Sequence, residues 1–337
     1  MNIYITLDYE LFFGESGSVE NCMINPTKEI LEVANRYDVK LNFFVDSGYL
    51  LALEKQKNEF QNLQKDYSLI VDQLRHLSKM GHGIELHIHP HWEDSFYDGS
   101  KWVFNLSRYK ISSFDQDQIV RIVDSHVDIL DRIIGKRPVA YRAGGWSAQP
   151  FDKIQGALIK NNILIDSSVF PKGKHKSKNQ YYNYSMVPRF TTNYNFDKDI
   201  TLQDDKGIFT EIPISSFKVK PWFFWNFAFI KLFKNPKHQP YGDGFAIKMP
   251  KMEMMRLLFL PSYTVVSIDG FKASLIEKAF NLYYKHTTVN DNFVLIGHPK
   301  AFTPYSINKV ENFIKKHFKT HTFATFESIK NKNAIHK

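Results

Sequence analysis

The 337-residue sequence is poor in cysteine and lacks long apolar runs. Its single cysteine, Cys22, excludes an internal disulfide. No stretch reaches the about 18 uninterrupted apolar residues typical of a membrane-spanning helix, so none is expected. The first residues, MNIYITLDYE, have no basic segment and carry Asp8 and Glu10, so we expect a first core strand rather than a signal peptide. These absences favour a reducing, cytoplasmic location.

Signatures of nucleic-acid binding are also missing. The 44 Lys and Arg residues exceed the 35 Asp and Glu residues and give a net charge of +9. No helix-turn-helix, zinc-finger or RNA-recognition motif accompanies this charge, so we expect no nucleic-acid partner. The positive charge would attract an anionic sugar, a nucleotide-sugar or an anionic membrane surface as well as it would attract a nucleic acid.

No internal repeat and no low-complexity linker divides the chain, and we treat residues 1–337 as one domain. Strand-like and helix-like patterns alternate almost from the first residue, which predicts an α/β fold with a parallel sheet, open or closed into a barrel. The region 172–262 breaks this alternation and is interpreted as a long insertion, rich in aromatic and basic residues.

Residues 81–92 read GHGIELHIHPHW and place three histidines at alternate positions, His87, His89 and His91. Alternate side chains of a strand share one face, and Pro90 should end the strand. Several neutral imidazoles at one strand end suit a divalent metal, although a solvated polar strand end is the ordinary alternative.

Ionisable residues also follow the other predicted strands. They are Asp8 and Glu10, Arg142, Asp166, Glu211 and His298. In parallel α/β folds the strand ends gather into one site, and residue types of this kind serve metal-assisted hydrolysis.

The segments TLDYE, ELHIHPH, YRAGGW, LIDSSVF and LIGHP, in this order, resemble the five motifs of the NodB-type polysaccharide deacetylases, the family-4 carbohydrate esterases of bacteria and other organisms. The resemblance covers about residues 1–300 without the insertion. It implies a distorted (β/α)₇ barrel and a metal-dependent hydrolase that removes an acetyl or similar acyl group from a sugar. Polysaccharide or glycolipid biosynthesis is the expected setting. The substrate would be an acetylated sugar, an oligosaccharide, a nucleotide-sugar or a lipid-linked sugar.

The resemblance also implies a metal site, with zinc as the expected ion. The family's histidine motif matches His87 and His91. Its first motif has two aspartates, a base and a ligand, whereas this chain has Asp8 followed by Tyr9. Tyrosine is a poor zinc ligand, so we expect Glu10 to supply the missing carboxylate.

Further roles follow from the same motifs. Asp8 is the expected general base, with Arg142 orienting it, and His298 is the expected general acid, with Asp166 orienting it. The expected substrate contacts are His89, Trp92, a backbone N–H near Gly145 that would serve an oxyanion hole, and the aromatic wall of Trp146.

Two alternatives stay open. A catalytically impaired, carbohydrate-binding relative would use Trp92, Trp102 and Trp146 as stacking platforms without an intact metal site. An amidohydrolase-like metal enzyme also uses an H-x-H pair, but places it on its first strand, whereas here the pair follows the third.

The segment 217–238, FKVKPWFFWNFAFIKLFKNPKH, carries a dense aromatic run. Such runs usually pack into a core, and we expect that of this one. Lysines on both sides leave a second interpretation, a peripheral contact with an anionic membrane.

Overall fold

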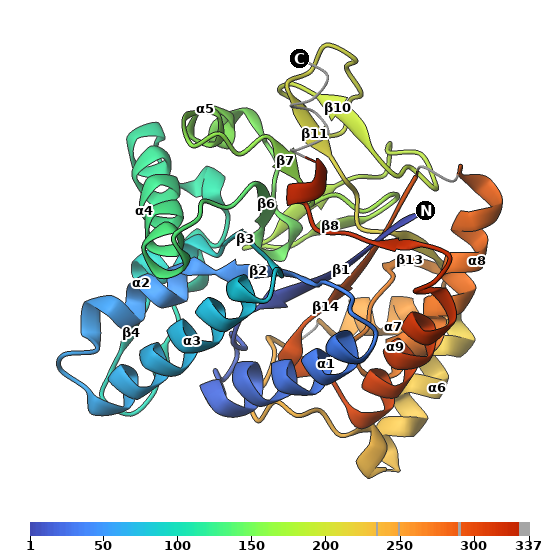
Figure 1. The fold of residues 1–337 in the computed structure, drawn as a ribbon, viewed down its shortest axis with the longest axis horizontal. Coiled ribbons are helices and arrows are strands. Elements are labelled where there is room, and N and C mark those ends of the chain that lie inside the picture. Colours follow the sequence, from blue (N-terminus) through green and yellow to red (C-terminus); the bar gives the residue numbers. More distant parts are fainter. Residues whose placement is uncertain (234, 249, 289–290, 330–337) are drawn as a thin grey trace.

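The computed structural model describes residues 1–233, 235–248, 250–288 and 291–329. A sheet of nine strands forms its centre (Figure 1). Its strands are β1 (Asn2–Tyr9), β2 (Asn42–Asp46), β3 (Gly83–Ile88), β6 (Ala140–Ala143), β7 (Ile165–Asp166), β10 (Tyr194–Phe196), β11 (Phe209–Glu211), β14 (Asn292–Gly297) and β15 (Thr322–Phe323).

The spatial order is β10-β11-β7-β6-β3-β2-β1-β14, with β15 also paired to β1. All neighbouring pairs are parallel except β10 with β11. The sheet curls back on itself, because Ser215 N–H donates to the Val294 carbonyl of β14 at 3.0 Å and Ile268 N–H donates to Ile296 at 2.9 Å. The predicted distorted α/β barrel is confirmed.

Helices lie around the outside of this sheet (Figure 1). They are α1 (Asn25–Arg36), α2 (Ser47–Gln56), α3 (Gln61–Lys79), α4 (Gln116–Ile134), α5 (Asp152–Lys160), α8 (Ile276–His286) and α9 (Pro304–His317). The start and end of α4 follow from sequence, since Asp115 and Gln118 form a capping box and Gly135 ends the helix at a φ of 68°.

Shorter elements connect these parts. Turns of 3-10 helix are Pro90–Asp94, Leu106–Arg108, Ile111–Ser113, Gly144–Trp146, Pro236–His238, Gly270–Leu275 and Pro299–Ala301, and a π turn is Glu20–Ile24. Three antiparallel ribbons pair β4 (Phe96–Tyr97) with β5 (Trp102–Val103), β8 (Lys174–Lys176) with β9 (Tyr181–Asn183), and β12 (Ser216–Val219) with β13 (Ser262–Val265).

The region interpreted as an insertion, 172–262, has two parts, one inside the central sheet and one outside it. Its strands β10 and β11 belong to the central sheet. Its last part instead leaves and rejoins the barrel at the β12–β13 ribbon, where Val219 is paired with Ser262. Between these two residues lie α6 (Pro221–Leu232) and α7 (Lys251–Phe259), at the right of Figure 1.

Candidate metal centre and active site

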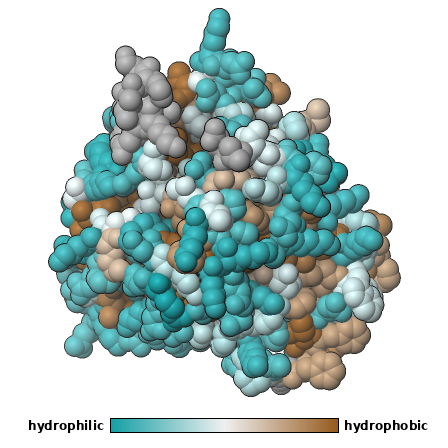
Figure 2. Space-filling model, turned by 45° about the vertical axis from the view of Figure 1, so that its right-hand side comes forward, coloured by the Kyte–Doolittle hydropathy of each residue, from teal (hydrophilic) through white to brown (hydrophobic). Residues whose placement is uncertain are grey.

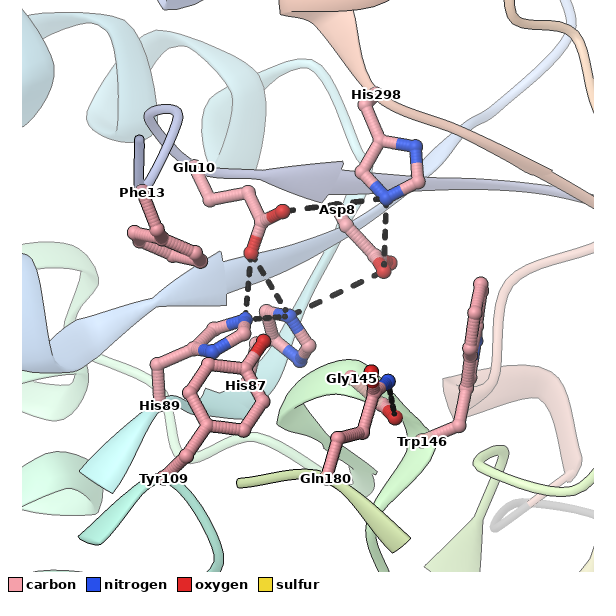
Figure 3. A pocket seen from close by; sticks show the side chains of 10 residues that line it. All are labelled: Asp8, Glu10, Phe13, His87, His89, Tyr109, Gly145, Trp146, Gln180 and His298. Atoms are coloured by element: carbon pink, nitrogen blue, oxygen red, sulfur yellow. Dashed lines mark hydrogen bonds and ion pairs between the residues drawn. The ribbon is translucent and has the colours of Figure 1, made fainter. Parts of the chain in front are cut away.

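The carboxyl end of β1 presents two carboxylates to the inside of the barrel. Asp8 and Glu10 are both buried and share one face of the chain (Figure 3). Tyr9, between them, points the other way and donates its hydroxyl hydrogen bond to Gln73 of α3 at 2.7 Å. This alternation explains why Glu10, and not residue 9, can stand beside the histidines.

Glu10, His87 and His89 bring three potential ligand atoms to one point (Figure 3). Glu10 Oε2 lies 3.2 Å from His87 Nε2 and 2.6 Å from His89 Nε2, and the two nitrogens are 3.1 Å apart. Ligand atoms of a tetrahedral zinc ion are about 3.3 Å apart, so the spacing is close to that of a metal site.

The protonation state of His87 supports this assignment. His87 Nδ1 is 2.9 Å from the Arg142 carbonyl, which can only accept, so Nδ1 carries the hydrogen. Nε2 then faces Glu10 and His89, and in the neutral ring its lone pair is the one that a metal would bind. The donor set of one carboxylate and two imidazoles fits a divalent metal.

His91, predicted from the motif as the third ligand, lies outside this cluster, and His89 takes its place. Alternation in β3 keeps His87 and His89 on one face, whereas Pro90 opens a 3-10 turn that carries His91 away. The His91 ring is stacked at 5.4 Å on Trp92 and at 5.5 Å on Tyr109. Burial, followed by the charge of His89, lowers its pKa well below the ordinary value, so His91 is a neutral packing residue.

Gly144 permits the close approach of β6 to His89. A Cβ at this position would lie 2.6 Å from His89 Nδ1 and 2.7 Å from the Ile88 carbonyl oxygen. A larger residue would therefore displace the imidazole from the cluster. The first glycine of the GGW segment is thus required by the position of His89 in the cluster with Glu10 and His87.

Lys300 is a further charged member of the site. Its ammonium group is buried and donates to Glu10 Oε1 at 2.8 Å and to the Leu11 carbonyl at 2.6 Å. Burial alone would raise the pKa of Glu10, but Lys300 and then the two histidines outweigh it and hold the pKa well below its usual range. Lys300 occupies one oxygen of Glu10, and the other oxygen faces His87 and His89, where it could bind a metal.

Asp8 is held by Arg142, as the sequence predicted. Arg142 Nη1 donates to Asp8 Oδ1 at 2.5 Å, while its Nε donates to the Ser167 carbonyl at 2.8 Å and its Nη2 to Thr6 Oγ1 at 3.0 Å. The guanidinium also lies 3.9 Å from the Phe44 ring centroid. These contacts fix one oxygen of Asp8 and leave Oδ2 facing the cavity, 3.6 Å from His298 Nε2.

His298 stands across the site from the metal ligands and is oriented by Asp269. Asp269 Oδ2 is 2.8 Å from His298 Nδ1, and Asp269 Oδ1 accepts the His298 backbone N–H at 2.8 Å. Burial lowers the pKa of His298, but the negative charge of Asp269, with Asp8 and Glu10, outweighs it and raises the pKa overall. The ring is therefore suited to donating a proton from Nε2.

Asp166 was predicted to orient His298, and this position is corrected to Asp269. Asp166 Oδ1 accepts the Ser168 backbone N–H at 2.7 Å, and across the parallel strands its neighbour is Glu211. Burial raises the pKa of both carboxyl groups, and the charge of Asp166 raises that of Glu211 further. Both carboxyl groups are fully buried, so they form a polar cluster inside the barrel and not a partner for His298.

These groups surround a cavity of about 200 Å³. Besides the charged residues it is lined by Phe13, Tyr109, Gly145, Trp146 and Gln180 (Figure 3). Gly145, at a φ of 57°, accepts a hydrogen bond from Gln180 Nε2 at 2.6 Å through its carbonyl oxygen.

Of the tryptophans expected at the substrate, Trp146 lines the cavity and Trp92 does not. Trp92 is buried and donates its indole N–H to Asp46 Oδ2 at 2.6 Å, and Trp102 packs at 5.0 Å against it. Both are core residues, which removes two of the three stacking platforms that a purely carbohydrate-binding protein would need.

Sequence reasoning missed five residues of the site: Phe13, Tyr109, Gln180, Asp269 and Lys300. A signal existed for one of them, because Asp269 directly follows the predicted strand 265–268, at the position where ionisable residues were found after other strands. Lys300 lies two residues beyond His298, and nothing in the local pattern links it to Glu10.

No protein-family model matches the sequence, and no curated protein matches it. Several solved structures are similar to the structure of this chain. The crystal structure of a proposed polysaccharide deacetylase from Mycobacterium smegmatis has a TM-score of 0.52 at 15% identity, over 98% of this chain and 89% of that one. PuuE allantoinase has a TM-score of 0.49 at 12% identity, over 97% and 88% of the two chains. A polysaccharide deacetylase from Bacillus cereus has a TM-score of 0.41 at 12% identity, over 97% and 93%. The likeness to the Mycobacterium smegmatis structure shows that this chain has the polysaccharide-deacetylase barrel fold, the fold that its five motifs imply.

Proposed function

We propose that this protein is a metal-dependent carbohydrate deacetylase, which hydrolyses an acetyl amide or ester on a sugar. The observation that carries the proposal is the convergence of Glu10, His87 and His89 between a base and an acid, Asp8 and His298. A divalent metal bound there, zinc being the expected ion, would polarise the acetyl carbonyl and lower the pKa of a water molecule.

The chain's own residues supply the proton transfers. Asp8 takes a proton from the attacking water through Oδ2, the oxygen that Arg142 leaves free. His298 gives a proton from Nε2 to the leaving nitrogen or oxygen, while Asp269 holds the Nδ1–H. Amide or ester and water become amine or alcohol and acetate, so the two proton transfers balance.

The cavity fits an acetylated edge of a sugar rather than a whole oligosaccharide. Pockets that enclose a drug-sized ligand measure about 300–1,000 Å³, more than the 200 Å³ found here. Trp146 and Tyr109 provide aromatic walls, and the N–H of Gly145 is proposed to support the oxyanion. The remainder of the substrate would lie outside the cavity.

The test is metal analysis of the purified protein, combined with acetate release from a panel of N- and O-acetylated sugars, nucleotide-sugars and lipid-linked sugars. Asp8→Asn should keep the metal and lose about 10²–10⁴-fold in turnover. A protein that binds no metal and releases no acetate contradicts the proposal and favours the carbohydrate-binding alternative, whereas full activity in Asp8→Asn refutes the role of Asp8 as the base.

A further inference from the structure

The segment 217–262 concentrates exposed apolar side chains to a degree not found elsewhere in the described chain. Twelve of the eighteen large hydrophobic side chains that are exposed among the described residues belong to it. They are Trp222, Trp225, Phe229, Leu232, Phe233, Phe245, Ile247, Met252, Met254, Met255, Phe259 and Leu260. Figure 2 shows brown side chains gathered at the lower right, on the side of the molecule that carries α6 and α7. We call these twelve residues the apolar face.

The expected helix packed onto the barrel is present, since Phe223 and Phe224 of α6 are half-buried against the core, but the run does not enter the core. Neither α6 nor α7 contains a buried residue. The two helices touch each other, since Trp225 donates its indole N–H to the Leu258 carbonyl at 2.9 Å, and Phe223 is stacked on Phe271 of the barrel at 5.3 Å. These contacts attach the helices to the barrel but leave their outer sides uncovered.

The segment that carries the apolar face is strongly basic. Residues 217–262 contain seven lysines and one arginine against one aspartate and one glutamate, so 8 − 2 gives +6 of the chain's net +9. Lys218, Lys220, Lys231, Lys251 and Arg256 are all exposed. An apolar surface on a segment with many exposed cations is complementary to an anionic lipid surface, where each basic residue adds attraction.

Other occupants fit this face less well. A second copy related by a two-fold axis would bring one +6 surface against another. Protein interfaces are depleted in lysine, and here lysine is abundant. No helix among the described residues has the length and apolar character to cross a bilayer, so the contact would lie along the surface.

We propose that the apolar face is a docking surface for an anionic membrane, with α6 and α7 lying in the interface. The 12 residues of α6 extend about 18 Å, which suits a helix lying along the headgroup region rather than spanning it.

The same segment is hydrogen-bonded to parts of the chain that lie next to the active site, although none of its described residues lines the cavity. Gly14 and Glu15, which follow Glu10, both donate their N–H groups to the Phe245 carbonyl at 3.0 Å, and Gly242 N–H donates to the Lys300 carbonyl at 3.1 Å. On another side, His175 of β8 lies 3.4 Å from Glu253 of α7, and β8 is paired with the strand that follows Gln180. Docking would thus hold the cavity near the lipid surface, which points to an acetylated sugar attached to a lipid as substrate. This substrate assignment rests on the proposed deacetylase function, whereas membrane binding does not.

Cosedimentation with vesicles tests the surface without using activity. Vesicles of phosphatidylcholine alone are compared with vesicles of phosphatidylcholine and phosphatidylglycerol, at low and high salt. The test variant combines Leu232→Ser, Phe233→Ser and Met252→Ser, whose side chains are 76%, 80% and 83% exposed and so can change without disturbing the fold. The matched control combines Met186→Ser and Leu202→Ser, which are 76% and 61% exposed outside the apolar face.

The intact protein should bind the anionic vesicles and lose binding at high salt. The triple variant should bind about 100-fold more weakly, and the control should bind as the intact protein does. Lys231→Glu with Lys251→Glu should weaken binding about tenfold or more, whereas Lys206→Glu should not. The inference is overturned if the intact protein stays in the supernatant, or if the triple variant binds unchanged. It is also overturned if the intact protein is a dimer that the triple variant converts to monomer without vesicle binding. Cleavage of a soluble acetyl ester by the triple variant tests the deacetylase proposal separately.

Discussion

The role of His298 as a proton donor can be tested through its partner Asp269. In Asp269→Asn, the amide oxygen can still accept the His298 backbone N–H that Asp269 accepts at 2.8 Å. The amide nitrogen, however, replaces the oxygen 2.8 Å from Nδ1 and would donate to that nitrogen. The substitution therefore favours the neutral ring, whereas the aspartate raises the pKa of His298 and favours the charged one.

The size of the effect follows from the hydrogen bond that is lost. A hydrogen bond to a charged group contributes about 1.5–3 kcal/mol, which corresponds to about 10- to 150-fold in rate. Because the acid works only when protonated, activity is lost as the pH rises through the pKa of His298. Asp269→Asn should move this alkaline limb to lower pH, and His298→Ala should remove about 10²–10⁴-fold of turnover.

The assay compares two leaving groups. Release of acetate from an N-acetylated sugar needs a proton on the leaving amine, whereas a nitrophenyl acetate leaves as a stable anion and needs none. Both variants should be slow on the first substrate and near normal on the second. If Asp269→Asn keeps the alkaline limb in place, or if His298→Ala is equally slow on both substrates, the assignment of the acid is wrong.

Three further predictions concern the metal ligands and the buried charges. His89→Ala should lose the metal and His91→Ala should keep it, as measured by metal analysis; the opposite pattern would restore the assignment made from the motif. Lys300→Met should destabilise the metal-free protein by about 3–5 kcal/mol in urea denaturation, because it removes the cation that is hydrogen-bonded to the buried Glu10 carboxylate. An unchanged midpoint of denaturation would show that this ion pair does not contribute to stability. Burial raises the pKa of Glu85 from 4.5 to about 8, so the folded protein keeps a proton that the unfolded chain loses between these values. The contribution of this group to stability should fall by about 1.4 kcal/mol per pH unit in that range, and Glu85→Gln should flatten the profile; an identical slope in the variant would refute this.

The sequence predicted most of the barrel because its signals are local. The alternation of residues in β1 and β3 placed Asp8, Glu10 and His87 on the inner side, and the capping residues around α4 set its ends. The strand positions also brought Arg142 next to Asp8. In each case the side-chain direction depends on a few neighbouring residues, which a single sequence contains.

The incorrect predictions concern residues whose positions depend on contacts with distant parts of the chain. His91 was chosen from motif spacing, although Pro90 turns it out of the strand direction. The pair formed by Asp269 and His298 joins residues 29 positions apart, and that formed by Lys300 and Glu10 joins residues 290 apart. The aromatic run of α6 was expected to pack onto the barrel, because such runs usually go to the core. Composition alone could not show that only part of its surface would be covered.

The ribbon of β12 and β13 has a consequence for how such an enzyme changes in evolution. Residues 220–261 leave and rejoin the barrel at one ladder rung, Val219 with Ser262. Insertions and deletions at such a hairpin end cost little loop-closure entropy and do not shift the strands on which Asp8, His87 and Arg142 lie. Descendants of one ancestor could therefore vary this segment and reach new substrates while inheriting the same hydrolytic chemistry, provided that its hydrogen bonds to Gly14, Glu15 and Lys300 are kept.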